Sequence, residues 1–315
     1  MLSKLHMSID GRDWSYETID GRPVAGNGFS RCRSLLSVTV PPGVLRIEDS
    51  AFSGCDLLQS VSLPDGVREI GSRAFQNCRS LVLVQIPAST AVIRDEAFRG
   101  CRGLVSVTLP RGIQQLGDWL FCDCTSLVSV EISSGIRKIP RGMFYGCSHL
   151  EDINIPAGVR EVGNHAFFSC IALPSLTFPD GVCRVGECAC WNCLSLSRVG
   201  IPQSVAEIGA FSFWDCSELM SVALPSSLVA IGEGSFHGCK GLSAVVIPPG
   251  VTVIQSWMFC GCSGLTSVSI PKSVVKIGRG AFYGCVRLSA VTIPRDVREI
   301  GTAAFHDSIT VCRSL

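Results

Sequence analysis

The chain has 315 residues, a formal net charge of +1 at pH 7, 47% hydrophobic residues and only 17% charged residues. A nucleic-acid-binding protein normally carries a basic patch or stripe, so this balance argues against a nucleic-acid partner. No run of 18 apolar residues occurs, which argues against membrane insertion. The N-terminal stretch lacks the apolar core of a signal peptide. We therefore expect a cytoplasmic protein, or a cell-surface or secreted one if a leader is missing from this sequence.

Residues 1–28 are more polar than the rest and precede a strict 23-residue repeat. We expect them to form an N-terminal cap in which Trp14 and Tyr16 cover the first repeat unit. The repeat itself is marked by twelve cysteines, each 23 residues from the next, without insertion or deletion. These cysteines are residues 32, 55, 78, 101, 124, 147, 170, 193, 216, 239, 262 and 285.

Other residues keep the same spacing. A phenylalanine stands three residues before each of these cysteines, except where Cys190 replaces it, and a leucine stands three residues after. A proline closes each unit, except at Ser133. A glycine recurs at a bend, as at Gly71 and Gly117, where we expect a need for a small residue or a positive φ.

Each unit contains two local periods, which can be followed in residues 271–293, PKSVVKIGRGAFYGCVRLSAVTI. L-x-x-V-x-I ends in the alternation of a short strand, whereas V-x-x-I-G-x-x-A-F-x-x-C has the three and four spacing of a helical or 3₁₀ turn. So short a unit must stack on its neighbours to bury its apolar face. We predict an α/β solenoid over residues 29–307, with a continuous parallel sheet on one face and the helical turns on the other. Residues 308–315 are a decayed repeat or a C-terminal cap.

The repeat resembles the BspA-like, treponemal-class leucine-rich repeats, whose unit reads roughly L-x-x-L-x-L-P-x-x-L-x-x-I-G-x-x-A-F-x-x-C/N. The resemblance covers residues 29–307 and eight positions in each unit. It implies a right-handed superhelix with the sheet on its concave side. It also implies a role in recognition or adhesion, often at the surfaces of bacteria or protists, and it supplies no catalytic residue.

The 18 cysteines raise the question of a metal, redox or disulfide site. We expect the twelve regularly spaced ones to be free, buried thiols that act as small hydrophobic groups and bond backbone carbonyls. Disulfides between units are the alternative, because Cα atoms about 4.8 Å apart lie within bridging range, but the parallel Cβ atoms lie too far apart. The dense stretch Cys188-Ala-Cys-Trp-Asn-Cys193, with Cys183, should point its thiols in different directions. We therefore expect neither metal nor cofactor.

Two outward-facing stripes are candidate binding surfaces. The strand face is small and polar, with its strongest polar groups in the middle units: Glu131, Asp152, Asn154 and Arg198. A second stripe, on the turns, is aromatic; it contains Trp119, Tyr145, Phe168, Trp191, Phe211, Trp214, His237 and Trp257. The alternatives are a solvated sheet face and rings that half-bury against each other. Aromatic residues are enriched at binding hot spots.

These features favour a non-enzymatic scaffold that binds a protein partner through the repeat surface. A surface adhesin that recognises host proteins or glycans is the alternative. Self-association through the aromatic stripe is a further possibility. The five histidines lie in different units, and no nucleophile and base recur together, so an enzyme is not expected.

Overall fold

The computed structural model describes residues 3–9, 12–19, 22–23 and 29–314. The chain forms two compact units, Met1–Pro156 and Ala157–Leu315, and each is described by itself. In the first unit, β1 (Ser3–Ile9), β2 (Arg12–Ile19) and β3 (Arg22–Pro23) form an antiparallel sheet. The predicted N-terminal cap therefore contains strands. The side chains of Trp14 and Tyr16 lie outside the described part of the chain.

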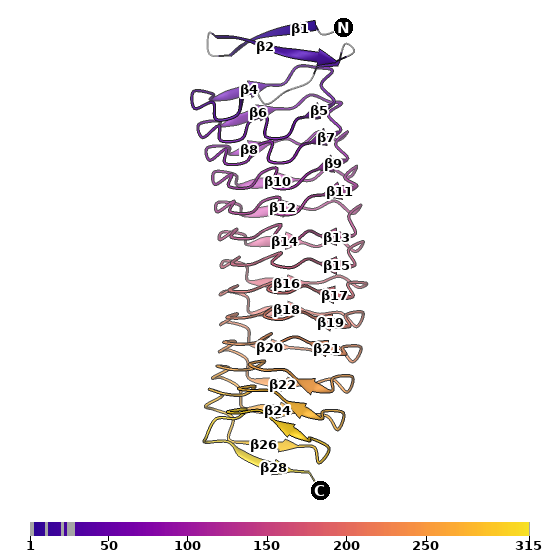
Figure 1. Cartoon of the computed structure of the whole chain (residues 1–315), viewed down its shortest axis with the longest axis vertical. Coiled ribbons are helices and arrows are strands. Elements are labelled where there is room, and N and C mark those ends of the chain that lie inside the picture. Colours follow the sequence, from indigo (N-terminus) through magenta and orange to yellow (C-terminus); the bar gives the residue numbers. More distant parts are fainter. Residues whose placement is uncertain (1–2, 10–11, 20–21, 24–28, 315) are drawn as a thin grey trace. The chain divides into compact units, whose positions relative to one another are not determined.

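The rest of the first unit is a stack of 23-residue coils whose strands run in two separate lines (Figure 1). One line is a six-stranded parallel sheet of β4 (Ser37–Thr39), β6 (Ser60–Ser62), β8 (Leu83–Val84), β10 (Ser106–Thr108), β12 (Ser129–Glu131) and β14 (Asp152–Asn154). The other is a four-stranded sheet of β5 (Arg46–Ile47), β7 (Glu69–Ile70), β9 (Val92–Ile93) and β11 (Gln115–Leu116); β13 (Lys138–Ile139) belongs to the following coil. Partners in the register are 23 residues apart, as Val107 and Val130 are. The predicted parallel solenoid of stacked coils is confirmed.

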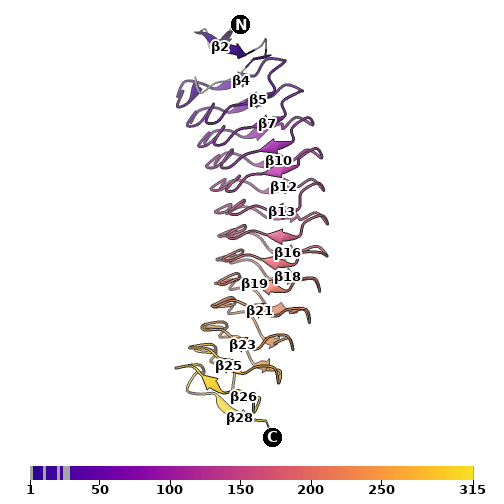
Figure 2. The same ribbon diagram turned by 45° about the vertical axis from the view of Figure 1, so that its right-hand side comes forward.

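The second unit repeats this plan, and Figure 2 shows its turns on both sides of the strands. Its first line comprises β16 (Ser175–Thr177), β18 (Arg198–Gly200) and β20 (Ser221–Val222), then the pair β22 (Ala244–Val246) and β24 (Ser267–Ser269), then the pair β26 (Ala290–Ile293) and β28 (Thr310–Arg313). Its second line comprises β15 (Glu161–Val162), β17 (Arg184–Val185), β19 (Glu207–Ile208) and β21 (Ala230–Ile231), then β23 (Val253–Ile254), β25 (Lys276–Ile277) and β27 (Glu299–Ile300). The sheet is thus segmented in this unit rather than continuous.

The predicted helical or 3₁₀ turns are wrong, because residues 30–314 contain no helix. The segment forms a series of β-turns and the second line of short strands instead. Its N–H groups alternate between two kinds of acceptor. Phe75 donates to the carbonyl of Ala97 in the next coil at 2.8 Å, whereas Gln76 closes a turn to Arg73 at 3.1 Å. Half of the N–H groups therefore bond the next coil, and the consecutive hydrogen bonds of a helix do not form within the coil.

Two positions in nearly every coil have a positive φ, which the repeat pattern did not reveal. In the coil of Phe75 they are Arg73 and Asn77, with φ of 58° and 59°. A type II turn needs this conformation at its third residue. At these positions a residue with a side chain in one coil can face a glycine in the next coil, and the side chain then fills the space that the glycine leaves. A Cβ added at Gly100 would lie 2.3 Å from Oδ1 of Asn77, so the asparagine occupies the space above that glycine.

The recurrent bend glycine has a different reason. Gly71 is not among the residues with positive φ, but an added Cβ would lie 2.7 Å from the backbone nitrogen of Asp49. At Gly117 the same atom would lie 2.2 Å from the nitrogen of Asp95. The neighbouring coil approaches so closely that only a small residue fits here. The glycine is therefore needed for its small size and not for a positive φ.

The core is built from columns of identical residues. Phenylalanine rings stack from coil to coil, with centroids 5.3 Å apart for Phe52 and Phe75 and 5.4 Å apart for Phe213 and Phe236. Each of these rings is at most 1% exposed. Cys190 stands in this column and is fully buried. The smaller side chain at Cys190 interrupts the ring column.

Candidate functional site

The regularly spaced cysteines form a row of free thiols that is buried except at Cys32, which is half-buried and whose thiol lies 3.7 Å from the hydroxyl of Ser34. All 18 cysteines lie in the described residues and none is in a disulfide. Cys101 donates its thiol to the carbonyl of Phe75 at 3.1 Å, and Cys262 donates to Phe236 at the same distance. The carbonyl of Phe75 also accepts a hydrogen bond from the N–H of Cys78, at 3.2 Å. The buried thiols of the row therefore fasten one coil to the one before it, as the sequence predicted, and Cys32 is the exception.

Burial makes most of these thiols poor acids. It raises the pKa of Cys55 to about 11 and that of Cys285 to about 12, from an ordinary value of 9.0. The pKa of Cys101, which has no exposed surface, is also raised well above its ordinary value for the same reason. A nucleophilic or metal-binding cysteine must lose its proton. The thiols with a raised pKa are therefore suited to packing rather than to chemistry. Cys193 differs, because its burial is outweighed by hydrogen bonds with the thiols of Cys190 and Cys216, which lower its pKa to about 5.

The cysteine-rich stretch does not form one site. Cys190 and Cys193 are buried, Cys188 is half-buried and Cys183 is exposed. The thiol of Cys183 donates to the carbonyl of Arg160 at 3.2 Å, away from the core. Among the described residues, no group of three or more His, Cys, Asp or Glu side chains could hold a metal ion.

The aromatic stripe of the second unit is a stack of rings. Phe168 lies 5.8 Å from Trp191, Trp191 lies 4.9 Å from Trp214, and Trp214 lies 3.6 Å from His237, with interplanar angles of 25°, 13° and 7°. Phe211 meets Trp214 edge-on at 5.4 Å. Burial lowers the pKa of His237, so the ring stays neutral in the stack. Ring faces thus cover each other, and mainly ring edges remain for a partner.

Trp119 in the first unit and Trp257 in the second unit have the same local surroundings. Both are half-buried and have positive φ, 58° and 59°. Each ring lies over the glycine of the next coil, where an added Cβ would clash with it at 2.1 Å for Gly142 and 2.5 Å for Gly280. An arginine guanidinium sits 5.3 Å from each indole, namely Arg141 and Arg279. Tyr145 adds an edge contact to Trp119 at 5.6 Å.

The predicted polar cluster is partly brought together. In the first unit, Glu131 on β12 is directly opposite Asn154 on β14, and Asp152 is opposite Ser129. Thr108 on β10 donates to Glu131 at 3.4 Å. These side chains share the outer face of one rigid sheet and are exposed, apart from half-exposed Ser129. Arg198 lies on β18 in the second unit, so it is not assigned to this cluster.

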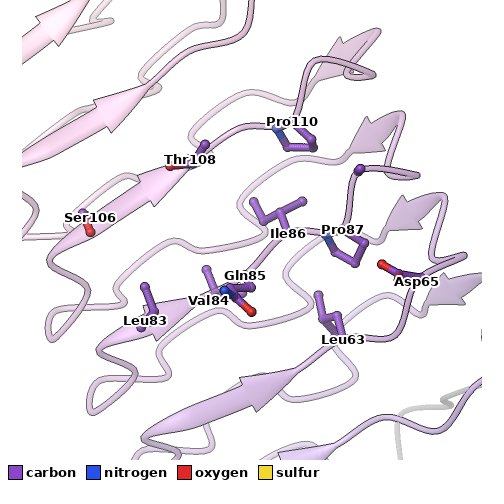
Figure 3. A pocket seen from close by; sticks show the side chains of 11 residues that line it. Leu63, Asp65, Leu83, Val84, Gln85, Ile86, Pro87, Ser106, Thr108 and Pro110 are labelled. Atoms are coloured by element: carbon purple, nitrogen blue, oxygen red, sulfur yellow. The ribbon is translucent and has the colours of Figure 1, made fainter.

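The same sheet carries a pocket that the sequence analysis missed. Its volume is about 480 Å³, and its lining comes from the strands and turns of three successive coils (Figure 3). Its walls are Leu63, Leu83, Ile86, Pro87 and Pro110, and its polar groups come from Asp65, Gln85, Ser106 and Thr108. The strands at the pocket share few paired residues: β8 pairs with β10 through one residue pair only, whereas β10 and β12 share three. The available signal was Leu83, a leucine in a column of serines.

Comparison with known proteins explains the repeat. A model of the BspA type leucine rich repeat region matches residues 24–91, 68–197 and 184–312. The chain belongs to the BspA-type leucine-rich repeat family. Proteins with such repeats generally act as scaffolds for protein interaction. A search of the curated proteins found no match.

Solved structures share the fold. A leucine-rich repeat protein from Bacteroides ovatus is 23% identical, with a TM-score of 0.54, and 100% of this chain and 98% of that chain are covered. A leucine rich cell surface protein from Faecalibacterium prausnitzii is 28% identical, with a TM-score of 0.56 and coverage of 88% and 79%. The pneumococcal vaccine antigen PcpA is 19% identical, with a TM-score of 0.55 and coverage of 89% and 79%. Within the described residues, no helix is long and apolar enough to cross a bilayer.

Proposed function

We propose that this BspA-type repeat protein is a non-enzymatic scaffold that binds a protein partner on the outer sheet face of its first unit. The observation that carries the proposal is the cluster of Glu131, Asp152 and Asn154 on paired strands. Asp152 and Asn154 make no side-chain hydrogen bond with any described residue. The pairing of β12 with β14 holds their backbones in place. Binding a partner therefore costs little backbone conformational entropy. Polar groups fixed in this way give specificity to an interface.

The aromatic stack of the second unit is the other proposed contact surface. Trp191 is half-buried, and its indole N–H has no hydrogen-bond partner among the described residues. An indole edge of this kind can donate to a partner's carbonyl while its ring adds apolar contact. Self-association of two copies through the stack would use the same edges.

The experiment is affinity capture from the native host with three forms of the full chain. One carries Glu131→Ala, Asp152→Ala and Asn154→Ala, one carries Trp191→Ala and Trp214→Ala, and the third is wild type. The proposal predicts a partner that the wild type recovers and the triple variant loses. Loss with the tryptophan variant alone would move the contact to the aromatic stack. Equal recovery with all three forms would refute both surfaces.

A surface adhesin that recognises host proteins or glycans is the second candidate. Similarity to the leucine rich cell surface protein from Faecalibacterium prausnitzii favours it. The buried free thiols instead favour a compartment that keeps cysteines reduced, and we propose a cytoplasmic location on that basis. Protease shaving of intact host cells separates the two. Digestion of the protein at the surface would overturn the cytoplasmic proposal, and protection until lysis would support it.

A further inference from the structure

The pocket on the first unit combines a long apolar wall with one charged group. Leu63 and Leu83 lie on two successive coils, and Figure 3 shows Leu63 and Asp65 on one side, with Ser106 and Thr108 on the other. Leu83 is 54% exposed, a high value for a leucine on a regular strand. Its side chain therefore offers apolar contact area to a ligand rather than to the core.

The only charged group that lines the pocket is acidic. Asp65 is exposed, and its carboxylate makes no hydrogen bond or ion pair with any described residue. The surrounding sheet has the same sign: across the strands β4 to β14 of this sheet, the only charged residues are Glu131 and Asp152. The strands of this sheet thus carry only negative charges, although the whole chain has a net charge of +1.

We infer that this pocket receives a lysine or arginine side chain from an extended segment of the partner protein. The methylene stem of such a side chain packs on apolar walls while its charge stays near water. Leu63, Leu83 and Pro110 supply those walls, and Asp65 receives the cation. Gln85, Ser106 and Thr108 supply acceptors and donors for the flanking peptide backbone. The inference rests on the proposed function, because it specifies the chemistry of the partner on the same sheet face.

The test uses the full chain and short peptides, so it needs no knowledge of the partner. Saturation-transfer NMR compares Ac-Gly-Lys-Gly-amide with Ac-Gly-norleucine-Gly-amide, which keeps the stem and loses the charge. Asp65→Asn removes the carboxylate. Asp180→Asn is its matched control, because Asp180 occupies the same Pro-Asp-Gly turn in the second unit. n-Butylamine, which has the carbon stem and single charge of a lysine side chain without a peptide backbone, tests whether the backbone contributes.

The lysine peptide should bind wild type and Asp180→Asn alike, and Asp65→Asn should weaken it about three-fold, the effect of one partly exposed ion pair. Added salt should weaken the same binding in the wild type, which supplies evidence independent of any variant. Equal signals from the lysine and norleucine peptides would overturn the inference, as would equal binding by n-butylamine and the lysine peptide. Loss of the captured host partner from the triple variant alone, with these peptide results negative, would leave the proposed function standing and refute the lysine pocket.

Discussion

Alkaline pH should unfold this protein through its buried thiols. Burial raises the pKa of seven regularly spaced cysteines above the ordinary value of 9.0, and none of the seven has exposed surface: Cys55, Cys78, Cys101, Cys124, Cys239, Cys262 and Cys285. Cys193 and Cys216 are left out of this sum, because their thiols interact with each other, and the pKa of Cys216 is raised whereas that of Cys193 is lowered. The folded state therefore holds the protons of the seven thiols more tightly than the unfolded state does. Their contribution to stability is complete below pH 9 and is lost as the pH rises toward the folded values.

The size of the effect follows from the number of thiols. At pH 10 an unfolded thiol lies about one unit above its pKa, which favours unfolding by about 1.4 kcal/mol. Seven such thiols together give about 10 kcal/mol, which is comparable to the whole stability of an ordinary domain, about 5–15 kcal/mol. We therefore expect the free energy of unfolding to collapse between pH 8 and pH 10.

The assay is urea unfolding followed by far-UV circular dichroism at pH 8 and pH 10, with thiolate absorbance near 240 nm recorded in parallel. Most thiolate should appear together with the loss of structure. Replacing Cys101 and Cys124 by alanine should reduce the pH dependence by about 3 kcal/mol. The control Cys183→Ser with Cys312→Ser, which removes the two exposed thiols, should leave it unchanged. Free energies at the two pH values that agree within about 2 kcal/mol would refute the reasoning.

Four further outcomes are expected. Phe75→Ala should lower the free energy of unfolding by about 3–5 kcal/mol, because it opens a gap in a stacked column; denaturant titration measures this. Gly71→Ala should cost about 1–3 kcal/mol, because the added methyl meets the backbone of Asp49; a melting temperature equal to that of the wild type would contradict the close approach. Ser133→Pro should stabilise by about 0.4–1 kcal/mol, because the buried hydroxyl has no partner and the Ser133 N–H donates to no described backbone carbonyl; a lower melting temperature would refute this. Thiol titration in denaturant without reductant should find close to 18 free thiols, whereas a clearly lower count would indicate disulfides.

The repeat could be read from the sequence because translation along a stack keeps each residue in one environment. A slot that is phenylalanine, cysteine or leucine in almost every unit must face the same core, and Phe75, Cys78 and Leu81 are all fully buried. Stacking also explains why a parallel sheet was predictable. Residues 23 positions apart meet as neighbours, and strands such as β12 need only three residues each.

The turns could not be predicted from apolar spacing alone. Inward residues separated by three and four fit a helix, but they fit a series of β-turns equally well. The choice depends on N–H groups such as that of Phe75, which bond the next coil and become visible only in the stack. One signal was available: the position just before the cysteine is Asn77 in one coil and Gly100 in the next. These residue types tolerate positive φ and indicate turns.

The binding surfaces were likewise predictable in part. Outward positions such as Glu131 and Asn154 follow from strand alternation, so their shared face was predictable. The pocket depends on the short pairing between β8 and β10, which no residue spacing reveals. The aromatic stripe was predicted as a band, but stacking of Trp191 on Trp214 hides the ring faces that would make the largest contact.

The most direct test of the account is photo-crosslinking in the native host. A benzophenone amino acid replaces Ser60, which is exposed on the sheet face of the first unit beside the pocket but does not line it, or Glu218, which is exposed on a turn of the second unit. A protein bound on the sheet face should give a discrete adduct from position 60 and none from position 218. An adduct from position 218 alone, or no adduct from position 60, would contradict the account.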